Sequence, residues 1–81
     1  KGGNFMDSYR LKGKMIEKKY TQKKMALELG ITQQSLSSKI NNRTQFTLKE
    51  IVHIVEKLEL ENDLDIFIET KMSKVQRQEN N

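Results

Sequence analysis

Cysteine and proline are both absent from this 81-residue sequence, and histidine occurs once. Disulfide frameworks are therefore excluded, and no cluster of His, Cys and Asp has the spacing of a zinc site. A chain of this length forms one small domain whose stability has to come from packing alone. There is no apolar run of about 20 residues and no signal-peptide core. We expect a cytoplasmic protein with no metal, no cofactor and no membrane partner.

Aromatic side chains are few, and the five present are too scattered to form a platform for stacked bases, which argues against single-strand nucleic-acid binding. The single histidine, His53, has no acid, serine or cysteine placed beside it in the sequence pattern to form a proton relay. We therefore expect no catalytic residues and no enzymatic activity.

The charges are distributed unevenly along the chain. Residues 1–49 carry eleven Lys and Arg against three acids, a net charge of +8, whereas residues 50–81 carry four against eight, a net charge of −4. A basic half of this kind suits a polyanionic partner, and the acidic half does not.

All periodic segments of the sequence have helical spacing, so the predicted class is all-α. Residues 1–5 have no periodicity and are interpreted as a vector-derived remnant ahead of a natural start at Met6. Residues 6–70 form the predicted domain, and residues 71–81 a polar tail that frays. Five helices are expected: one from Asp7 or Ser8 to about Lys19, then four that begin at the capping residues Thr21, Thr32, Thr47 and Asn62.

The expected core follows from the apolar positions of these helices. Thr47 and Glu50 have capping-box spacing ahead of the most apolar segment of the chain, which marks that helix as central. The first helix shows a narrower stripe, formed by Tyr9, Leu11 or Lys12, Met15 and Ile16. The others contribute Met25, Ala26, Leu29, Ile31, Leu36, Ile40, Ile51, Val52, Ile54, Val55, Leu58, Leu64, Ile66, Phe67 and Ile68.

The segment from Thr21 to Asn41 contains two short helices separated at Gly30, which is suited to a left-handed helix end. The second of these helices has only Leu36 and Ile40 as apolar positions. Its remaining surface is polar and includes Gln33, Gln34, Ser35, Ser37 and Ser38. A helix with so few buried positions and so many amides and hydroxyls is suited to present its outer face to a polar partner.

Three residues are spaced as a small residue packed between helices, a turn and the apolar anchor of the second helix: Ala26, Gly30 and Leu36. The segment Thr32-Gln33-Gln34-Ser35 is similar to the start of the recognition helix of lambdoid phage repressors. From Leu11 to Ile68 the chain resembles the helix-turn-helix of the Cro and phage-repressor (XRE-like) family. The resemblance implies a five-helix bundle of the lambda-repressor-like type and a phage-type transcriptional regulator that binds operator DNA. Lys39 and Asn42 depart from it, because many members carry an apolar residue and a glycine there.

Base readout is predicted for the amides and hydroxyls of the second helix, since a glutamine amide can bond adenine twice in the major groove. The predicted readers are Gln33, Gln34, Ser37 and Ser38. Phosphate contacts are predicted at helix starts and in the loop that follows, where N–H groups and cations meet an anion. They are Thr21, Gln22, Lys23, Thr32, Lys39, Asn41, Asn42, Arg43 and Thr44; by resemblance, Gln22 also braces Gln33.

The last predicted helix has more apolar residues than a small bundle needs. One edge is therefore predicted to form a homodimer interface, made by Leu60, Leu64, Phe67 and Ile68. An alternative function from another class is an antitoxin or adaptor that binds a partner protein through the acidic half. The operator sequence and the sign of regulation are not encoded in any recognisable motif.

Overall fold

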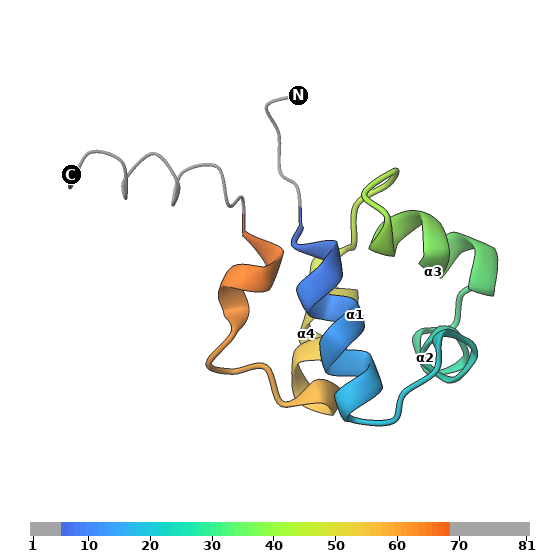
Figure 1. The fold of residues 1–81 in the computed structure, drawn as a ribbon. Helices are drawn as coiled ribbons and strands as arrows, with labels where there is room; N and C mark the ends of the chain where they lie inside the picture. Colours follow the sequence, from blue (N-terminus) through green and yellow to red (C-terminus); the bar gives the residue numbers. More distant parts are fainter. Residues whose placement is uncertain (1–5, 69–81) are drawn as a thin grey trace.

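The computed structural model describes residues 6–68, which form four α-helices and one 3₁₀ helix (Figure 1). In chain order these are α1 (Ser8–Glu17), α2 (Gln22–Leu29), α3 (Gln33–Ile40), α4 (Leu48–Leu58) and the 3₁₀ helix η1 (Leu64–Phe67). Over this range there is no strand, which confirms the all-α class. In the same range, no helix combines the length and apolar character that crossing a membrane requires.

Each α-helix begins at a side chain that accepts a hydrogen bond from the backbone N–H three residues later. The predicted caps Thr21, Thr32 and Thr47 are confirmed, with N–O distances of 3.0, 2.9 and 3.1 Å, and Asp7 caps α1 at 3.2 Å. The Glu50 side chain also accepts from the Thr47 N–H at 2.9 Å, which completes the capping box. Four local signals thus set where the four helices start.

Left-handed residues end or follow all four α-helices, and Glu59, with φ of 57°, ends α4. Gly30 has φ of 73° and terminates α2 as predicted, while Asn42 has φ of 65° and turns the chain after α3. α1 is shorter than predicted, since it ends at Glu17 and Lys19 adopts φ of 61° two residues later. The tight turn after Gly30 brings α3 directly against α2.

The core draws on every element. Eight large side chains are almost completely buried: Leu11, Met25, Leu36, Ile40, Ile54, Leu58, Leu60 and Ile66. Tyr9 and Ile16 were predicted in the core stripe of α1 but are exposed, because Leu11 and Met15, one turn apart, occupy the inward side. Val52 was also predicted in the core and is half exposed on α4.

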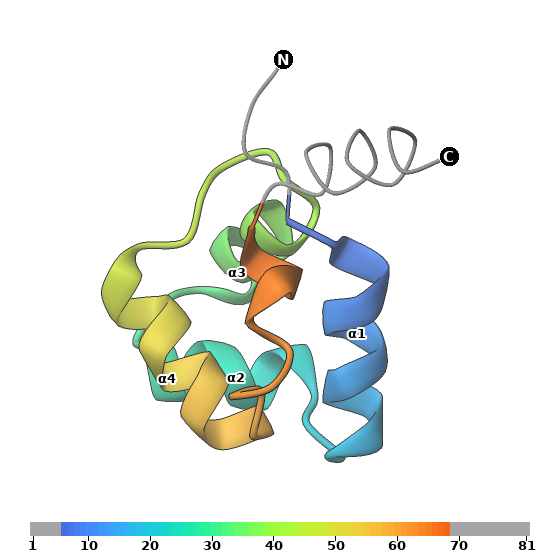
Figure 2. The ribbon, with the colours of Figure 1, turned by 90° about the vertical axis from the view of Figure 1, so that its left-hand side faces the viewer.

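The predicted fifth α-helix is a short 3₁₀ helix, and Asn62 does not cap it. Asp63 precedes η1 without a side-chain capping bond, and the segment is held by α1 instead. Arg10 donates to Asp65 at 2.8 Å and to Asp63 at 3.3 Å, and the Asp7 N–H donates to the Ile66 carbonyl at 2.8 Å. These bonds explain how so short an element, seen beside α1 in Figure 2, has a defined place.

The helices divide the molecule into two sides. In Figure 1, α2 and α3 lie on one side of α1, η1 lies on the other, and α4 passes behind α1. The view turned by 90° in Figure 2 places η1 in front and α3 behind. α3 and η1 are therefore at opposite sides of the fold.

Candidate nucleic-acid interface

The exposed start of α3 is the main candidate site. The left-handed Gly30 and the extended backbone of Thr32 (φ −78°, ψ 158°) redirect the chain into α3, and the Thr32 hydroxyl accepts from the Ser35 N–H at 2.9 Å. Leu36 and Ile40 are fully buried, so they hold the helix to the core along one side. Gln33 and Gln34 are exposed in the first turn. The anchoring pair and the two amides are where the sequence predicts them.

Ser37 and Ser38 are half buried, and they are less free than the two glutamines. The Asn41 side-chain amide donates to the Ser37 carbonyl at 3.0 Å and to the Ser37 hydroxyl at 3.4 Å. The Ser38 carbonyl accepts from the backbone N–H of Arg43 at 2.8 Å and of Thr44 at 3.4 Å. The backbone of both serines therefore closes the end of α3, and only their hydroxyl groups contribute to its polar outer face.

Several predicted phosphate contacts lie exposed around this face. The Thr21 and Thr32 hydroxyls cap α2 and α3, and each retains its own proton for donation. Lys23 is exposed on the first turn of α2. Arg43 and Thr44 are exposed in the loop of residues 41–47 that follows α3. Gln22 is half buried, and in the described part of the chain no hydrogen bond joins it to Gln33.

Two predicted phosphate contacts are engaged inside the protein instead. The Lys39 ammonium group donates to Glu50 at 2.9 Å, because residue 39 lies on the side of α3 that meets the start of α4. The Asn42 amide accepts from the Met6 N–H at 2.9 Å and donates to the Met6 carbonyl at 3.0 Å. Both side chains thus already have partners within the protein, and their role as phosphate contacts stays a prediction. Asn41 is partly engaged, since it also accepts from Lys12 at 3.2 Å.

The predicted dimer residues are not a single surface. Leu60 has no exposed area and belongs to the core of its own chain, so its assignment to an interface is wrong. Phe67 is half buried and meets the Phe46 ring edge-on, with ring centres 6.3 Å apart. Leu64 and Ile68 are 48% and 60% exposed, and these two side chains remain available.

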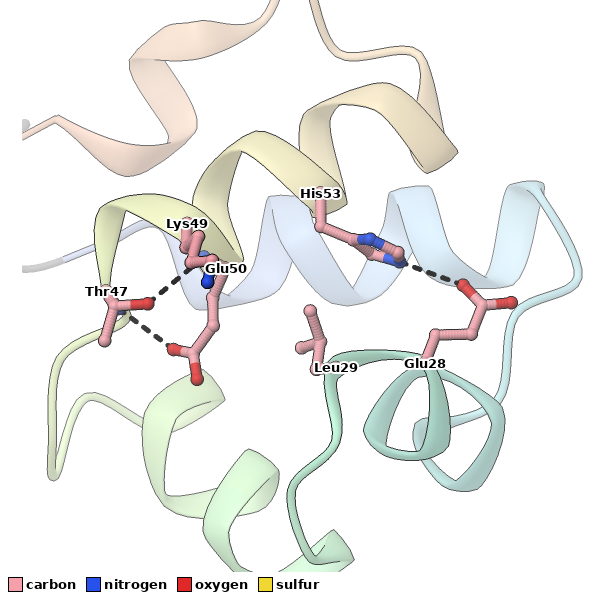
Figure 3. A pocket seen from close by; sticks show the side chains of 6 residues that line it. All are labelled: Glu28, Leu29, Thr47, Lys49, Glu50 and His53. Atoms are coloured by element: carbon pink, nitrogen blue, oxygen red, sulfur yellow. Dashed lines mark hydrogen bonds and ion pairs between the residues drawn. The ribbon is translucent and has the colours of Figure 1, made fainter.

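An open depression lies between α2 and α4 (Figure 3). It has a volume of about 310 Å³ and is lined by Glu28, Leu29, Thr47, Lys49, Glu50 and His53. The sequence pattern places no acid beside His53, but in the fold its Nε2 lies 3.1 Å from a Glu28 oxygen, 25 residues away in the chain. The Tyr20 hydroxyl donates to the same oxygen at 2.8 Å. Hydrogen bonds from Tyr20 and then His53 lower the pKa of Glu28.

The Glu28 group joins α2 to α4 and does not resemble a metal centre. Within residues 6–68, no three His, Asp or Glu side chains are grouped so that they could hold a metal ion. Glu28 and His53 are each about 29% exposed, so solvent screens the pair strongly. The contact supports the packing of α2, the helix that carries Thr21 and Lys23, against α4.

No curated protein and no solved structure matches the chain. A family model described as "Protein of unknown function (DUF739)" matches residues 5–68, which include all the elements described above. The chain therefore belongs to the DUF739 family.

Proposed function

We propose that this protein is a sequence-specific double-stranded DNA-binding transcriptional regulator of the Cro or phage-repressor type. In this proposal α2, the turn at Gly30 and α3 act as a helix-turn-helix, and α3 enters the major groove. The observation that supports it most is the position of Gln33 and Gln34, exposed in the first turn of a helix that buried Leu36 and Ile40 anchor to the core. N-terminal residues of a recognition helix are those that reach base edges.

The chemistry of the exposed groups suits this role. A glutamine amide can donate an N–H to adenine N7 and accept a hydrogen bond from the adenine N6 amino group, and this pair of bonds distinguishes adenine in the major groove. The start of α3 also directs free N–H groups and the positive end of the helix dipole outward, which favours an anion such as a phosphate. Lys23 on α2 and Arg43 in the loop after α3, both exposed, supply positive charge.

A homodimer would place two such helices on one face of the duplex. We propose that exposed Leu64 and Ile68 form its interface, with Phe67 at the edge. Two copies of α3 would then contact half-sites ~34 Å apart, one turn of B-DNA. Analytical ultracentrifugation with and without the selected duplex tests this arrangement. Monomers under both conditions would contradict it without affecting the assignment of α3.

The test of the proposed function is substitution of the two amides. Gln33→Ala and Gln34→Ala should each weaken binding to a selected duplex by about 1–3 kcal/mol while binding to random duplex changes little. Asn62→Ala is the matched control, because it removes an exposed amide from the segment between α4 and η1. Equal losses for selected and random duplexes would contradict base readout by α3.

A second candidate function, protein binding as an antitoxin or adaptor, is favoured by one observation. Leu48 and Val52 are exposed one turn apart on α4, the helix that leads from the basic half of the chain into the acidic half. A partner held by this surface should bind the Gln33→Ala and Gln34→Ala variants as well as the unaltered protein. Val52→Asp should abolish such a complex and leave DNA binding unchanged.

A further inference from the structure

The loop of residues 41–47 is fastened to the rest of the protein at two points. On one side, Asn42 makes two hydrogen bonds with the Met6 backbone, at 2.9 and 3.0 Å. On the other, Lys39 and Glu50 form an ion pair across the base of the loop, at 2.9 Å. Arg43 and Thr44, the exposed polar residues of the loop, lie between these two attachments. A loop of seven residues is thereby confined without any regular structure of its own.

Lys39 is placed to hold the loop and not to reach outward. Its ammonium group donates to Glu50 and lies 3.4 Å from the Gln45 carbonyl, within the loop. It also lies 6.0 Å from the centre of the Phe46 ring. The Lys39 and Glu50 side chains are only 13% and 12% exposed, so salt screens this pair less than a surface pair.

Glu50 connects three parts of the structure through one carboxylate. The oxygen that accepts from Lys39 also accepts from the Thr47 N–H at 2.9 Å, and the Thr47 hydroxyl accepts from the Glu50 N–H at 3.1 Å. These last two bonds are drawn in Figure 3. The end of α3, the end of the loop and the first turn of α4 therefore meet at a single group. A substitution of Glu50 is therefore expected to alter the contacts of all three parts.

We propose that Lys39 is a positioning residue: its ion pair with Glu50 fixes the 41–47 loop so that Arg43 and Thr44 meet the DNA backbone beside α3. This inference rests on the proposed function, and it assigns Lys39 an internal role in place of a phosphate contact. The two roles make opposite predictions for Glu50. If Lys39 contacted phosphate, neutralising Glu50 would free that cation and tighten DNA binding. If the pair positions the loop, neutralising Glu50 weakens binding although a negative charge has been removed.

The test measures affinity for a selected duplex in a double-mutant cycle. Glu50→Gln keeps the side chain needed for the capping box and should weaken binding about threefold, and Lys39→Met should weaken it about tenfold. Glu50→Gln should no longer weaken binding in the Lys39→Met background, because the carboxylate then has no cation to hold. Lys39→Arg should restore affinity to within about twofold of the unaltered protein, since an arginine retains the charge and the reach.

Two control substitutions make the same changes in charge as Glu50→Gln and Lys39→Met, but at residues away from the loop. Glu56→Gln and Lys57→Met alter exposed residues of α4 that take no part in the loop. Glu56→Gln should tighten DNA binding slightly, as expected for loss of a negative charge, which is the opposite sign from Glu50→Gln. Tighter binding by Glu50→Gln, or additive effects in the cycle, would overturn the positioning role.

Amide hydrogen exchange separates this inference from the proposed function. The Arg43 and Thr44 N–H groups donate to the Ser38 carbonyl, and their exchange should accelerate about tenfold in Lys39→Met while the amides of α1 remain unchanged. Unchanged exchange in the loop would overturn the inference whatever the DNA results. If the unaltered protein shows no preference for any duplex, the proposed function fails, and faster exchange in Lys39→Met would still support Lys39 as the residue that positions the loop.

Discussion

Helices α3 and α4 bury the same number of side chains but present different outer faces. Leu36 and Ile40 are the buried residues of α3, and Ile54 and Leu58 are those of α4. The outer face of α3 carries amides and hydroxyls, whereas α4 leaves Leu48 76% exposed and Val52 50% exposed. We expect the exposed residues of both helices to contribute little to folding, because they bury little apolar area. The polar outer face of α3 is suited to a partner that forms hydrogen bonds. The exposed apolar residues of α4 are suited to contact an apolar surface of another protein.

The largest expected effect is the difference in the free energy of unfolding between a substitution at a buried anchor residue of α3 and one at an exposed residue of α4. Leu36→Ala should lower the free energy of unfolding by about 2–5 kcal/mol, because it removes fully buried methyl groups and leaves a cavity. Leu48→Ala makes the same chemical change at an exposed position of α4 and should alter stability by less than about 0.5 kcal/mol. Urea unfolding followed by circular dichroism measures both. Similar losses in the two variants would show that the outer face of α4 is also needed for folding.

The next effect concerns the turn that directs α3 outward. Gly30→Ala should destabilise the protein by about 1–2 kcal/mol, because φ of 73° is strained for a residue with a Cβ. Gly13→Ala should instead stabilise it by up to about 1 kcal/mol, since Gly13 lies inside α1 with open space around it. Opposite shifts in the melting temperature are expected. A gain in stability for Gly30→Ala would contradict the described turn.

A smaller effect tests whether the loop beside α3 meets phosphate. Arg43→Met should reduce the slope of log affinity against log salt by about 0.9, the contribution of one neutralised phosphate. Lys57→Met also removes one positive charge, but from the exposed side of α4, and should leave the slope unchanged. Titrations of a labelled duplex at several salt concentrations measure both slopes. Equal reductions of the slope in the two variants would mean that the salt dependence reflects only the net charge of the protein and not a phosphate contact at Arg43.

The smallest expected effect lies at acidic pH. Burial acts to raise the pKa of Glu50, but the bonds from the Thr47 N–H and Lys39 outweigh it, and the pKa is lowered from its ordinary 4.5. The folded state therefore favours the ionised group. The ionised Glu50 carboxylate stabilises the protein above about pH 4.5. This stabilisation is lost as the pH falls through the lower pKa that Glu50 has in the folded state.

Urea unfolding of the unaltered protein and of Glu50→Gln as a function of pH measures this contribution. The unaltered protein should be the more stable of the two near neutral pH, and the difference should shrink below about pH 4.5. A difference that is constant down to acidic pH would show that the ionised state of Glu50 does not stabilise the junction of α3 and α4.

The features that the sequence predicts correctly are local ones. The caps Thr21, Thr32 and Thr47 each bond within their own first turn, and Gly30 changes the backbone direction by itself. Leu36 and Ile40 are the only large apolar residues of α3, so they had to be its buried side. These signals were sufficient to predict four helix starts or ends and the exposed position of Gln33.

The features that the sequence does not predict depend on contacts between distant residues. Lys39 looks like an exposed cation until α4 brings Glu50 to it, and Asn42 looks free until Met6 reaches it across 36 residues. Leu60 was predicted at a dimer interface, but it lies two residues after the end of α4 and its side chain packs into the core of its own chain with no exposed area. The periodicity of apolar residues does not indicate which residue, distant in the sequence, contacts a given side chain in the fold.

The most direct measurement of the central claim is a selection of binding sites from random duplexes, followed by competition at physiological salt. If α3 reads base edges through Gln33 and Gln34, the unaltered protein should enrich a common sequence and bind it at least about 10³-fold more tightly than random duplex. Equal competition by selected and random duplexes would contradict the proposed function.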